Sequence, residues 1–431
     1  MGDPTDFYAT KNWTAGIIGL GYVGLPLAIT ATNAGLPVIG LDTDAAYVDR
    51  LRAGLSPIED VPDEQLAAAL AAGLEVTTDT DRLADADAIF ICVPSPLGRN
   101  REPDLSYIRA AAETIRRVAH PNLLVSLEST TYPGTTEDVI VPVVLDAGLT
   151  LDQNVWVAFS PERVSPGDEL KTADIPKVVG GVTPASTAVA TAAYERLVAS
   201  VHPVSSAAAA EMSKLLENTY RAVNIGLANE MSQLADALGI DIWEVIDAAA
   251  TKPFGFQAFY PGPGVGGHCI PLDPQFLAWR AREANFATRF IDLAEQVNVA
   301  QPVYTAGRIG ALMNEQRLPV NGSEILGVGI SYKRNIADDR ESASIEVLRE
   351  LEAKGAVVSV LDPVVGRKRI EQHGFVAVDP GDDLSRFALA AVLTDHDDID
   401  YATLAAAVPI VFDARGTYRS RGLSAPNVYT L

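Results

Sequence analysis

The sequence predicts an α/β protein in which two doubly wound domains are joined by a long central helix. Apolar runs alternate with helix-forming segments over the first 200 residues. A proline-free segment rich in helix formers then covers residues 207–238, and the alternation resumes from residue 324. We therefore expect Rossmann-like domains at residues 1–203 and 306–431, with a helical domain at residues 204–305 between them.

Composition and charge narrow the classes of function. Hydrophobic residues make up 48% and charged residues 21% of the 431 residues, which excludes a disordered or fibrous protein. The net charge of −23 repels phosphate backbones and anionic lipid, so we expect no nucleic-acid and no membrane partner. Residues 12–41 are uncharged, but their glycines and prolines argue against a membrane helix or signal peptide. We expect a cytoplasmic protein.

The first candidate site is a glycine motif, Gly19-Leu20-Gly21-Tyr22-Val23-Gly24, between two predicted strands. Gly19 permits a tight turn, Gly21 lets backbone N–H groups approach a pyrophosphate, and Gly24 lets helix and strand pack closely. Asp42 ends the second strand, where a carboxylate binds ribose hydroxyls and repels a 2′-phosphate, which favours NAD over NADP. The alternative is a glycine-rich structural turn.

Three further apolar runs, at residues 88–94, 123–127 and 155–159, predict buried parallel strands. Cys92 lies within the first and is expected to be a small core residue. The hydroxyl-bearing residues that follow the second run could bond a cofactor or cap a helix. After the third run, Glu162 beside Arg163 could belong to a site or form a surface ion pair.

The proline-free segment at residues 207–238 has apolar residues at a period near 3.6, which predicts one long helix. It is too long for a crossover helix and is expected to join two domains and to offer a dimerisation surface. Lys214 and Asn218 are four residues apart, so they share one face. They could serve a site or be an ordinary solvated pair.

A glycine-rich segment at residues 260–274 contains the second cysteine. Its glycines can wrap closely around a ligand, and Cys269 lies outside any apolar strand pattern. The neighbouring His268 and exposed N–H groups favour a nucleophilic thiolate, and Asp273 could orient a water or a base. Metal binding is the rival interpretation, but five histidines and two cysteines cannot assemble a structural zinc cluster, and we expect no metal.

The last third of the chain predicts a second parallel sheet, with strands at residues 324–332, 357–361, 389–393 and 410–413. It lacks the complete glycine motif, so a second dinucleotide is less expected than another nucleotide. Lys333, Arg334 and Arg340 form a cationic group that suits a diphosphate, although ordinary surface cations are the alternative.

At these motifs the chain resembles the UDP-glucose/GDP-mannose dehydrogenase family of nucleotide-sugar dehydrogenases. The resemblance rests on six motifs in the family's order, at residues 19–26, 128–135, 160–167, 211–218, 266–273 and 332–342. Residues 251–256 and 259–264 are most similar to the UDP-N-acetyl-D-glucosamine 6-dehydrogenase branch. UDP-glucose and UDP-N-acetyl-D-mannosamine are the alternative substrates. A two-electron 3-hydroxyacid dehydrogenase and a non-catalytic dinucleotide sensor are alternatives of other classes.

The resemblance implies a four-electron oxidation of a sugar C6 alcohol to a carboxylate with two NAD+. Asp273, through a water, and Lys214 would assist the first deprotonation. Cys269 would then capture the aldehyde as a thiohemiacetal, whose oxyanion Lys214 and Asn218 stabilise. Oxidation to a thioester would follow, and Glu162 would help water to hydrolyse it.

The resemblance also implies the binding residues and the assembly. The expected cofactor-binding residues are Gly19, Gly21, Tyr22, Val23, Gly24, Asp42, Pro94, Glu128 and Thr130. The expected UDP-sugar-binding residues are Lys214, Asn218, Lys252, Tyr260, Gly266, Lys333 and Arg340. Lys252 stands in a region where relatives that act on UDP-glucose carry an Arg that reaches the partner subunit. A homodimer through the central helix is expected.

Overall fold

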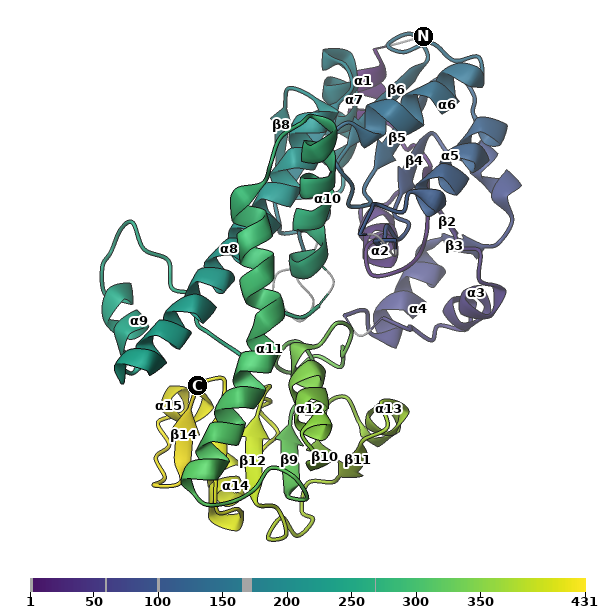
Figure 1. Cartoon of the computed structure of the whole chain (residues 1–431). Helices are drawn as coiled ribbons and strands as arrows, with labels where there is room; N and C mark the ends of the chain where they lie inside the picture. Colours follow the sequence, from purple (N-terminus) through teal and green to yellow (C-terminus); the bar gives the residue numbers. More distant parts are fainter. Residues whose placement is uncertain (1–2, 59, 99–100, 165–172, 268) are drawn as a thin grey trace. The chain divides into compact units, whose positions relative to one another are not determined.

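The computed structural model describes residues 3–58, 60–98, 101–164, 173–267 and 269–431. The chain divides into two compact units. The first comprises residues 1–217 and 275–286, and the second comprises residues 218–274 and 287–431. Helix α8 (Ala207–Leu238) is the long teal helix of Figure 1, and it runs from the first unit into the second.

The first unit contains an eight-stranded sheet in the order β3-β2-β1-β4-β5-β6-β7-β8. Its strands are β1 (Ala15–Ile18), β2 (Val38–Leu41), β3 (Leu74–Thr77), β4 (Ala88–Ile91), β5 (Leu123–Leu127), β6 (Val155–Phe159), β7 (Lys177–Gly181) and β8 (Val201–Val204). The first six are parallel, β7 is antiparallel to β6, and β8 is parallel to β7. The chain thus adds a reversed pair of strands to a doubly wound sheet.

Helices cover both faces of this sheet because its strands are apolar on both sides. One core cluster joins the sheet to α1 (Pro4–Thr10), α2 (Gly24–Asn33), α4 (Asp63–Ala72) and α7 (Pro184–Tyr194). The other joins it to α5 (Ser106–Val118), α6 (Val141–Asp146) and the first turns of α8. Helix α3 (Ala45–Arg52), the 3₁₀ turn η1 (Thr80–Asp85) and the π turn η2 (Thr136–Ile140) complete the unit.

The second unit contains a six-stranded, entirely parallel sheet in the order β11-β10-β9-β12-β13-β14. Its strands are β9 (Glu324–Val328), β10 (Val357–Leu361), β11 (Val376–Val378), β12 (Leu389–Val392), β13 (Val411–Asp413) and β14 (Val428–Thr430). Helices α12 (Ala343–Ala353) and α13 (Arg367–Gln372) lie on the face that also packs on α11. Helices α14 (Tyr401–Ala407) and α15 (Thr417–Ser420) contribute to the core of the other face.

The remaining helices follow α8 in the chain. They are α9 (Ile242–Ala250), α10 (Cys269–Glu283) and the 27-residue α11 (Arg289–Glu315). Along α8, Leu216, Leu227, Leu234 and Leu238 are each at least 50% exposed, so the helix keeps an uncovered apolar stripe. Among the helices of the described residues, none is long and apolar enough to cross a membrane.

The fold prediction is confirmed: two parallel-sheet, Rossmann-like units are linked by a long helix that has the predicted ends. Two details differ from the expectation. Cys92 follows β4 and is not inside it, although it is buried. Strands β3, β7, β8, β11 and β14 were not predicted. Strand β8 is partly exposed because it lies at the edge of the sheet.

Candidate active site

The glycine motif forms the turn between β1 and α2, and each glycine has its own steric reason. Gly19 has φ +89°, and a Cβ atom there would lie 2.8 Å from the carbonyl oxygen of Cys92. A Cβ at Gly24 would lie 1.8 Å from the carbonyl oxygen of Gly19. A Cβ at Gly21 would have nothing described within 4 Å, so this backbone is open to a ligand. Among the described side chains none caps α2, and its N-terminus suits a pyrophosphate.

Asp42 lies directly after β2 and is held beside the glycine turn. Its Oδ2 accepts a hydrogen bond from the Leu20 N–H over 3.0 Å, and its Oδ1 accepts one from the Asp44 N–H over 3.1 Å. The side chain stays half-buried, so its remaining lone pairs can accept from ribose hydroxyls. Tyr22 and Val23 lie directly before α2, and Tyr22 is 48% exposed. The first unit thus fits a dinucleotide with an unphosphorylated ribose.

Two loops extend the same edge of the sheet. Pro94 follows β4 and Thr130 follows β5. Strand β4 lies next to β1 and β5 lies next to β4, and all three are parallel. The Ser95 hydroxyl donates to the carbonyl oxygen of Thr130, and the Ser129 hydroxyl donates to that of Val93 over 2.7 Å. These bonds tie the two loops together beyond the carboxyl ends of the strands, where doubly wound folds bind ligands.

Glu128 directly follows β5, and its carboxylate is buried among protein groups. Oε2 lies 2.5 Å from the Lys177 Nζ, and Oε1 accepts from the Tyr194 hydroxyl over 2.5 Å. We expected Glu128 to bind the cofactor, but both of its oxygens are bonded inside the protein. Burial raises the pKa of this carboxyl above its usual value, although Lys177 acts in the opposite direction.

Glu162 and Lys214, which come from distant parts of the chain, are neighbours in the first unit. The Lys214 ammonium donates to the backbone carbonyl oxygen of Glu162 over 2.7 Å. The expected partner of Glu162, Arg163, pairs with Glu217 over 2.8 Å, and Glu162 pairs with Lys177 over 3.2 Å. Burial opposes ionisation of Glu162, yet the charge of Lys177 and two backbone N–H bonds outweigh it and hold the pKa of Glu162 below its usual value.

In the second unit, the exposed Cys269 is the first residue of α10. The partial positive charge at a helix N-terminus stabilises an anion, so this position favours a thiolate. One turn later Asp273 is buried, and its Oδ2 accepts from the Asn218 Nδ2 over 2.5 Å. Neither described cysteine forms a disulfide. His268, which we expected to assist the thiol, lies outside the described residues.

The glycines before Cys269 pack on the segment that carries the predicted diphosphate-binding cations. The Gly267 N–H donates to the carbonyl oxygen of Arg340 over 3.3 Å. A Cβ at Gly266 would lie 2.8 Å from the Glu341 carbonyl oxygen and 2.9 Å from the Tyr332 Cβ. Only glycine permits this approach, which brings the cysteine loop and residues 332–341 together inside one unit.

The expected cationic group is more paired than predicted. Arg340 forms a fork with Asp338, with Nε 2.9 Å from Oδ1 and Nη2 2.6 Å from Oδ2. Arg334 pairs with Asp397. The positive field at this segment is therefore partly neutralised by acidic neighbours, which composition could not reveal.

Two other expected substrate residues have clear neighbours. The Tyr260 hydroxyl donates to Asp247 over 2.9 Å, and its ring stacks on Trp243 at 5.5 Å between centroids. The Lys252 ammonium lies 5.0 Å from the centroid of the exposed Phe254 ring. The Tyr260 hydroxyl is thus hydrogen-bonded, whereas the contact of Lys252 within the described residues is with a neighbouring ring.

Taken by unit, the structure joins several predicted residues. The first unit contains Glu162, Lys214 and the glycine turn. The second unit contains Asn218, Asp273, Gly266 and Arg340. Sequence reasoning missed Lys177, whose signal was a charged residue that opens the apolar stretch Lys177–Gly181. Within the described part of the chain, no group of three or more His, Cys, Asp or Glu could hold a metal.

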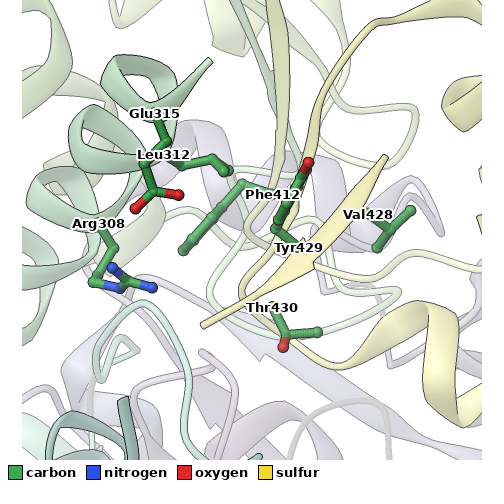
Figure 2. A pocket seen from close by; sticks show the side chains of 7 residues that line it. All are labelled: Arg308, Leu312, Glu315, Phe412, Val428, Tyr429 and Thr430. Carbon is green, nitrogen blue, oxygen red and sulfur yellow. The ribbon is translucent and has the colours of Figure 1, made fainter. Parts of the chain in front are cut away.

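A separate hollow of about 350 Å³ lies in the second unit, between α11 and the edge of the sheet (Figure 2). Its lining residues are Arg308, Leu312, Glu315, Phe412, Val428, Tyr429 and Thr430. None of the candidate site residues lines it. The Arg308 guanidinium pairs with Asp236 over 2.7 Å, so the main cation of the hollow already has a partner.

Comparison with known proteins decides the family. Models of the UDP-glucose/GDP-mannose dehydrogenase family match the NAD binding domain at residues 14–198, the central domain at 208–300 and the UDP binding domain at 326–420. The chain belongs to this family. It is an NAD-dependent UDP-sugar dehydrogenase, which confirms the predicted cofactor and enzyme class.

Relatives within the family differ in substrate. The chain is 35% identical to Protein CapL of Staphylococcus aureus, over 96% of this chain and 98% of the relative. It is 33% identical to the UDP-N-acetyl-D-glucosamine 6-dehydrogenase of Pseudomonas aeruginosa, over 85% and 87% of the two chains. The structure of the UDP-D-ManNAc dehydrogenase of Pyrococcus horikoshii has a TM-score of 0.85, with 29% identity over 97% and 98% of the chains.

Proposed function

We propose that the chain is a UDP-N-acetyl-D-glucosamine 6-dehydrogenase that converts the C6 alcohol to the carboxylate. The observation that carries this proposal is Cys269, exposed at the start of α10 and one turn from the buried Asp273. An alcohol dehydrogenase that stops at an aldehyde has no need of a nucleophilic thiol. Residues 251–264 and the Pseudomonas aeruginosa relative support the N-acetylglucosamine substrate. UDP-N-acetyl-D-mannosamine and UDP-glucose are the alternatives.

Each half-reaction has residues that suit it. NAD+, when bound at the glycine turn, accepts one hydride from C6 in each oxidation. Asp273, oriented by Asn218 and acting through a water, receives the hydroxyl proton in the first oxidation, and Lys214 assists. The aldehyde carbon then forms a bond to the Cys269 sulfur, and Lys214 and Asn218 donate to the resulting oxyanion.

Loss of the second hydride leaves a thioester, and hydrolysis releases the product. Glu162 accepts a proton from a water whose oxygen bonds to the acyl carbon while the carbon–sulfur bond breaks. The balance is one alcohol, two NAD+ and one water giving one carboxylate, two NADH and three protons.

The organisation of the chain follows from the same proposal. Residues 1–203 bind NAD, residues 204–305 carry the cysteine loop and the dimer surface, and residues 306–431 bind the UDP-sugar through Lys333 and Arg340. The exposed leucines of α8 support a homodimer, because an uncovered apolar stripe on a long helix favours burial against a second copy. A cytoplasmic location stays a prediction.

The experiment that tests the proposal counts NADH. Purified protein with UDP-N-acetylglucosamine should release two NADH per sugar, and kcat/KM should exceed that for UDP-N-acetylmannosamine and UDP-glucose. Cys269→Ser should stop after one NADH, whereas the matched Cys92→Ala should still give two. One NADH per sugar in the unmodified enzyme, with free aldehyde accumulating, would refute the cysteine mechanism.

A further inference from the structure

Lys177 is a buried ammonium in the first unit for which the family motifs give no role. It begins β7, and its side chain is only 3% exposed. Its Nζ lies 2.5 Å from the Glu128 Oε2 and 3.2 Å from the Glu162 Oε2. A buried ammonium is costly without anionic partners, so the two carboxylates stabilise the charge of Lys177. Lys177 in turn favours the ionised form of both carboxylates, although burial still raises the pKa of Glu128.

The Glu128 side of this arrangement is fixed by other buried groups. The Tyr194 hydroxyl, from α7, donates to the Glu128 Oε1 over 2.5 Å. The Ser126 hydroxyl lies 2.8 Å from the same tyrosine oxygen. Because β5, α7 and β7 each contribute a side chain to this hydrogen-bonded group, the Lys177 ammonium is held in place independently of its contact with Glu162.

The Glu162 carboxylate has nearly all of its hydrogen-bond acceptor directions occupied. Its Oε1 accepts from the N–H groups of Arg163 and Val164, both over 2.8 Å, and its Oε2 accepts from Lys177. A carboxylate offers about four lone-pair directions, so the described contacts use three and leave one on Oε2. A carboxylate with a single remaining direction can hold one water in one orientation.

We propose that Lys177 is a positioning residue that turns the Oε2 of Glu162 toward the hydrolytic water of the second half-reaction. The inference rests on the proposed function, because it assigns Lys177 to the hydrolysis step of that mechanism. In this step the water oxygen bonds to the acyl carbon, the Cys269 sulfur leaves as a thiolate, and one water proton passes to Glu162. Lys177 itself transfers no proton.

The charge of Lys177 has a measurable effect on Glu162. Among the described residues of the first unit, the titratable groups that interact with Glu162 or its backbone are Lys177, Glu128, Lys214 and the buried Cys92 thiol. Burial disfavours the carboxylate form, and Lys177 is the main charge that outweighs it. Removing that charge should raise the pKa of Glu162, so the acid limb of the hydrolysis rate moves to higher pH.

The test compares Lys177→Met with Lys177→Arg, using UDP-N-acetylglucosamine and NAD+ as probes. In Lys177→Met, the burst of NADH before hydrolysis should persist, and a protein-bound thioester should accumulate by mass spectrometry. Turnover should fall about 100-fold, the cost of misplacing a reacting group by about 1 Å. The acid limb should rise by about one pH unit or more. Lys177→Arg should restore most of the turnover and should return the acid limb of the pH profile to its position in the unmodified enzyme.

Two further variants keep the test decisive. Glu128→Gln removes a negative neighbour and leaves Lys177 to Glu162 alone, so its acid limb should move the opposite way, to lower pH. This result decides the question if Lys177→Met does not fold. Glu211→Gln alters another buried carboxylate of the first unit, which accepts from the Gly134 and Thr136 N–H groups, and it should leave the limb in place.

The outcomes separate this inference from the function on which it rests. If the unmodified enzyme gives two NADH but Lys177→Met and Glu128→Gln leave the acid limb and thioester level unchanged, the role of Lys177 is refuted. Equal loss of the NADH burst and of turnover in Lys177→Met would also refute it, because that is the result of a general structural role. If the unmodified enzyme gives no second NADH, the proposed function itself fails.

Discussion

The Asn218 amide donates to the Asp273 carboxylate over 2.5 Å, and Asp273 is buried one helical turn after Cys269. The bond joins α8 to the beginning of α10 within the second unit. Residues four apart share a face of a helix, so the Asp273 carboxylate and the Cys269 thiol lie on the same face of α10. The hydrogen bond from Asn218 holds the carboxylate in place there. The proton acceptor and the nucleophile of the proposed mechanism are therefore held by one short element.

Asn218→Ala should slow the first oxidation. A hydrogen bond to a charged group contributes about 1.5–3 kcal/mol, so kcat should fall about 10- to 150-fold while the KM for NAD+ stays unchanged. Stopped-flow measurement of the first NADH checks this. Asn224, partly buried on the same helix with its amide bonded to the Tyr220 carbonyl oxygen, provides the matched control Asn224→Ala. Equal kcat in the two variants would contradict the role of Asn218.

Gly21→Ala should weaken NAD+ binding without disturbing the fold. A Cβ at Gly21 meets nothing described within 4 Å, so the melting temperature should stay unchanged. The same methyl group would occupy the approach of a pyrophosphate, and the KM for NAD+ should rise about tenfold or more, ~1.4 kcal/mol of binding free energy. Gly307→Ala, on α11 and equally open, is the control. An unchanged KM in Gly21→Ala would argue against this cofactor site.

Gly266→Ala should weaken binding of the UDP-sugar and leave binding of NAD+ unchanged. The added methyl group would crowd the Glu341 carbonyl oxygen and the Tyr332 Cβ atom, and overpacking of this kind costs about 1–3 kcal/mol. Separation of the cysteine loop from residues 332–341 should raise the KM for the UDP-sugar about tenfold. Isothermal titration with UDP and with NAD+ checks this, because only the UDP affinity should fall. Gly310→Ala, whose nearest described neighbour lies at 3.6 Å, should bind both normally.

Two buried aspartates should give stability changes of opposite pH dependence. Burial disfavours the Asp362 carboxylate, but the His396 ring and backbone N–H groups outweigh it and lower the pKa of Asp362. The resulting stabilisation is present above about pH 4 and is lost as pH falls through the folded-state pKa. Asp362→Asn should therefore lower the free energy of unfolding by about 2 kcal/mol at pH 7, and by less below pH 4.

Asp413 is the comparison, because burial raises its pKa. Ionised Asp413 is disfavoured in the fold at neutral pH, so Asp413→Asn should cost little at pH 7 and relatively more as pH falls. Urea unfolding of both variants between pH 7 and pH 3.5 measures the two trends. Parallel trends would contradict the assignment of the two carboxylates.

Much of the fold was predictable because its signals are local. The turn at Gly19 and the ends of α8 follow from steric and periodic rules that need no knowledge of distant residues. The reversed strand β7 was not predictable, since nothing local distinguishes an antiparallel addition from another parallel strand.

The sequence could nominate site residues but not their pairings. The family resemblance indicated Glu162, Lys214 and Cys269, whereas the partner of a charged side chain depends on long-range packing. Arg163 was the obvious neighbour of Glu162 in the sequence, and Lys177 is the partner in space. The same reason explains Arg340, whose pairing with Asp338 reduces the positive charge expected there.

Asp42 and Asp362 occupy equivalent places, each just after the second strand of its sheet and each accepting an N–H from the turn that follows the first strand. Asp42 keeps part of its surface open, whereas Asp362 is 3% exposed and takes five donors, including the His396 ring. An engineer who grafted the missing glycines onto the second sheet would gain no ribose contact. His396 would have to be removed first, because it completes the shell around the acid that such a graft would need.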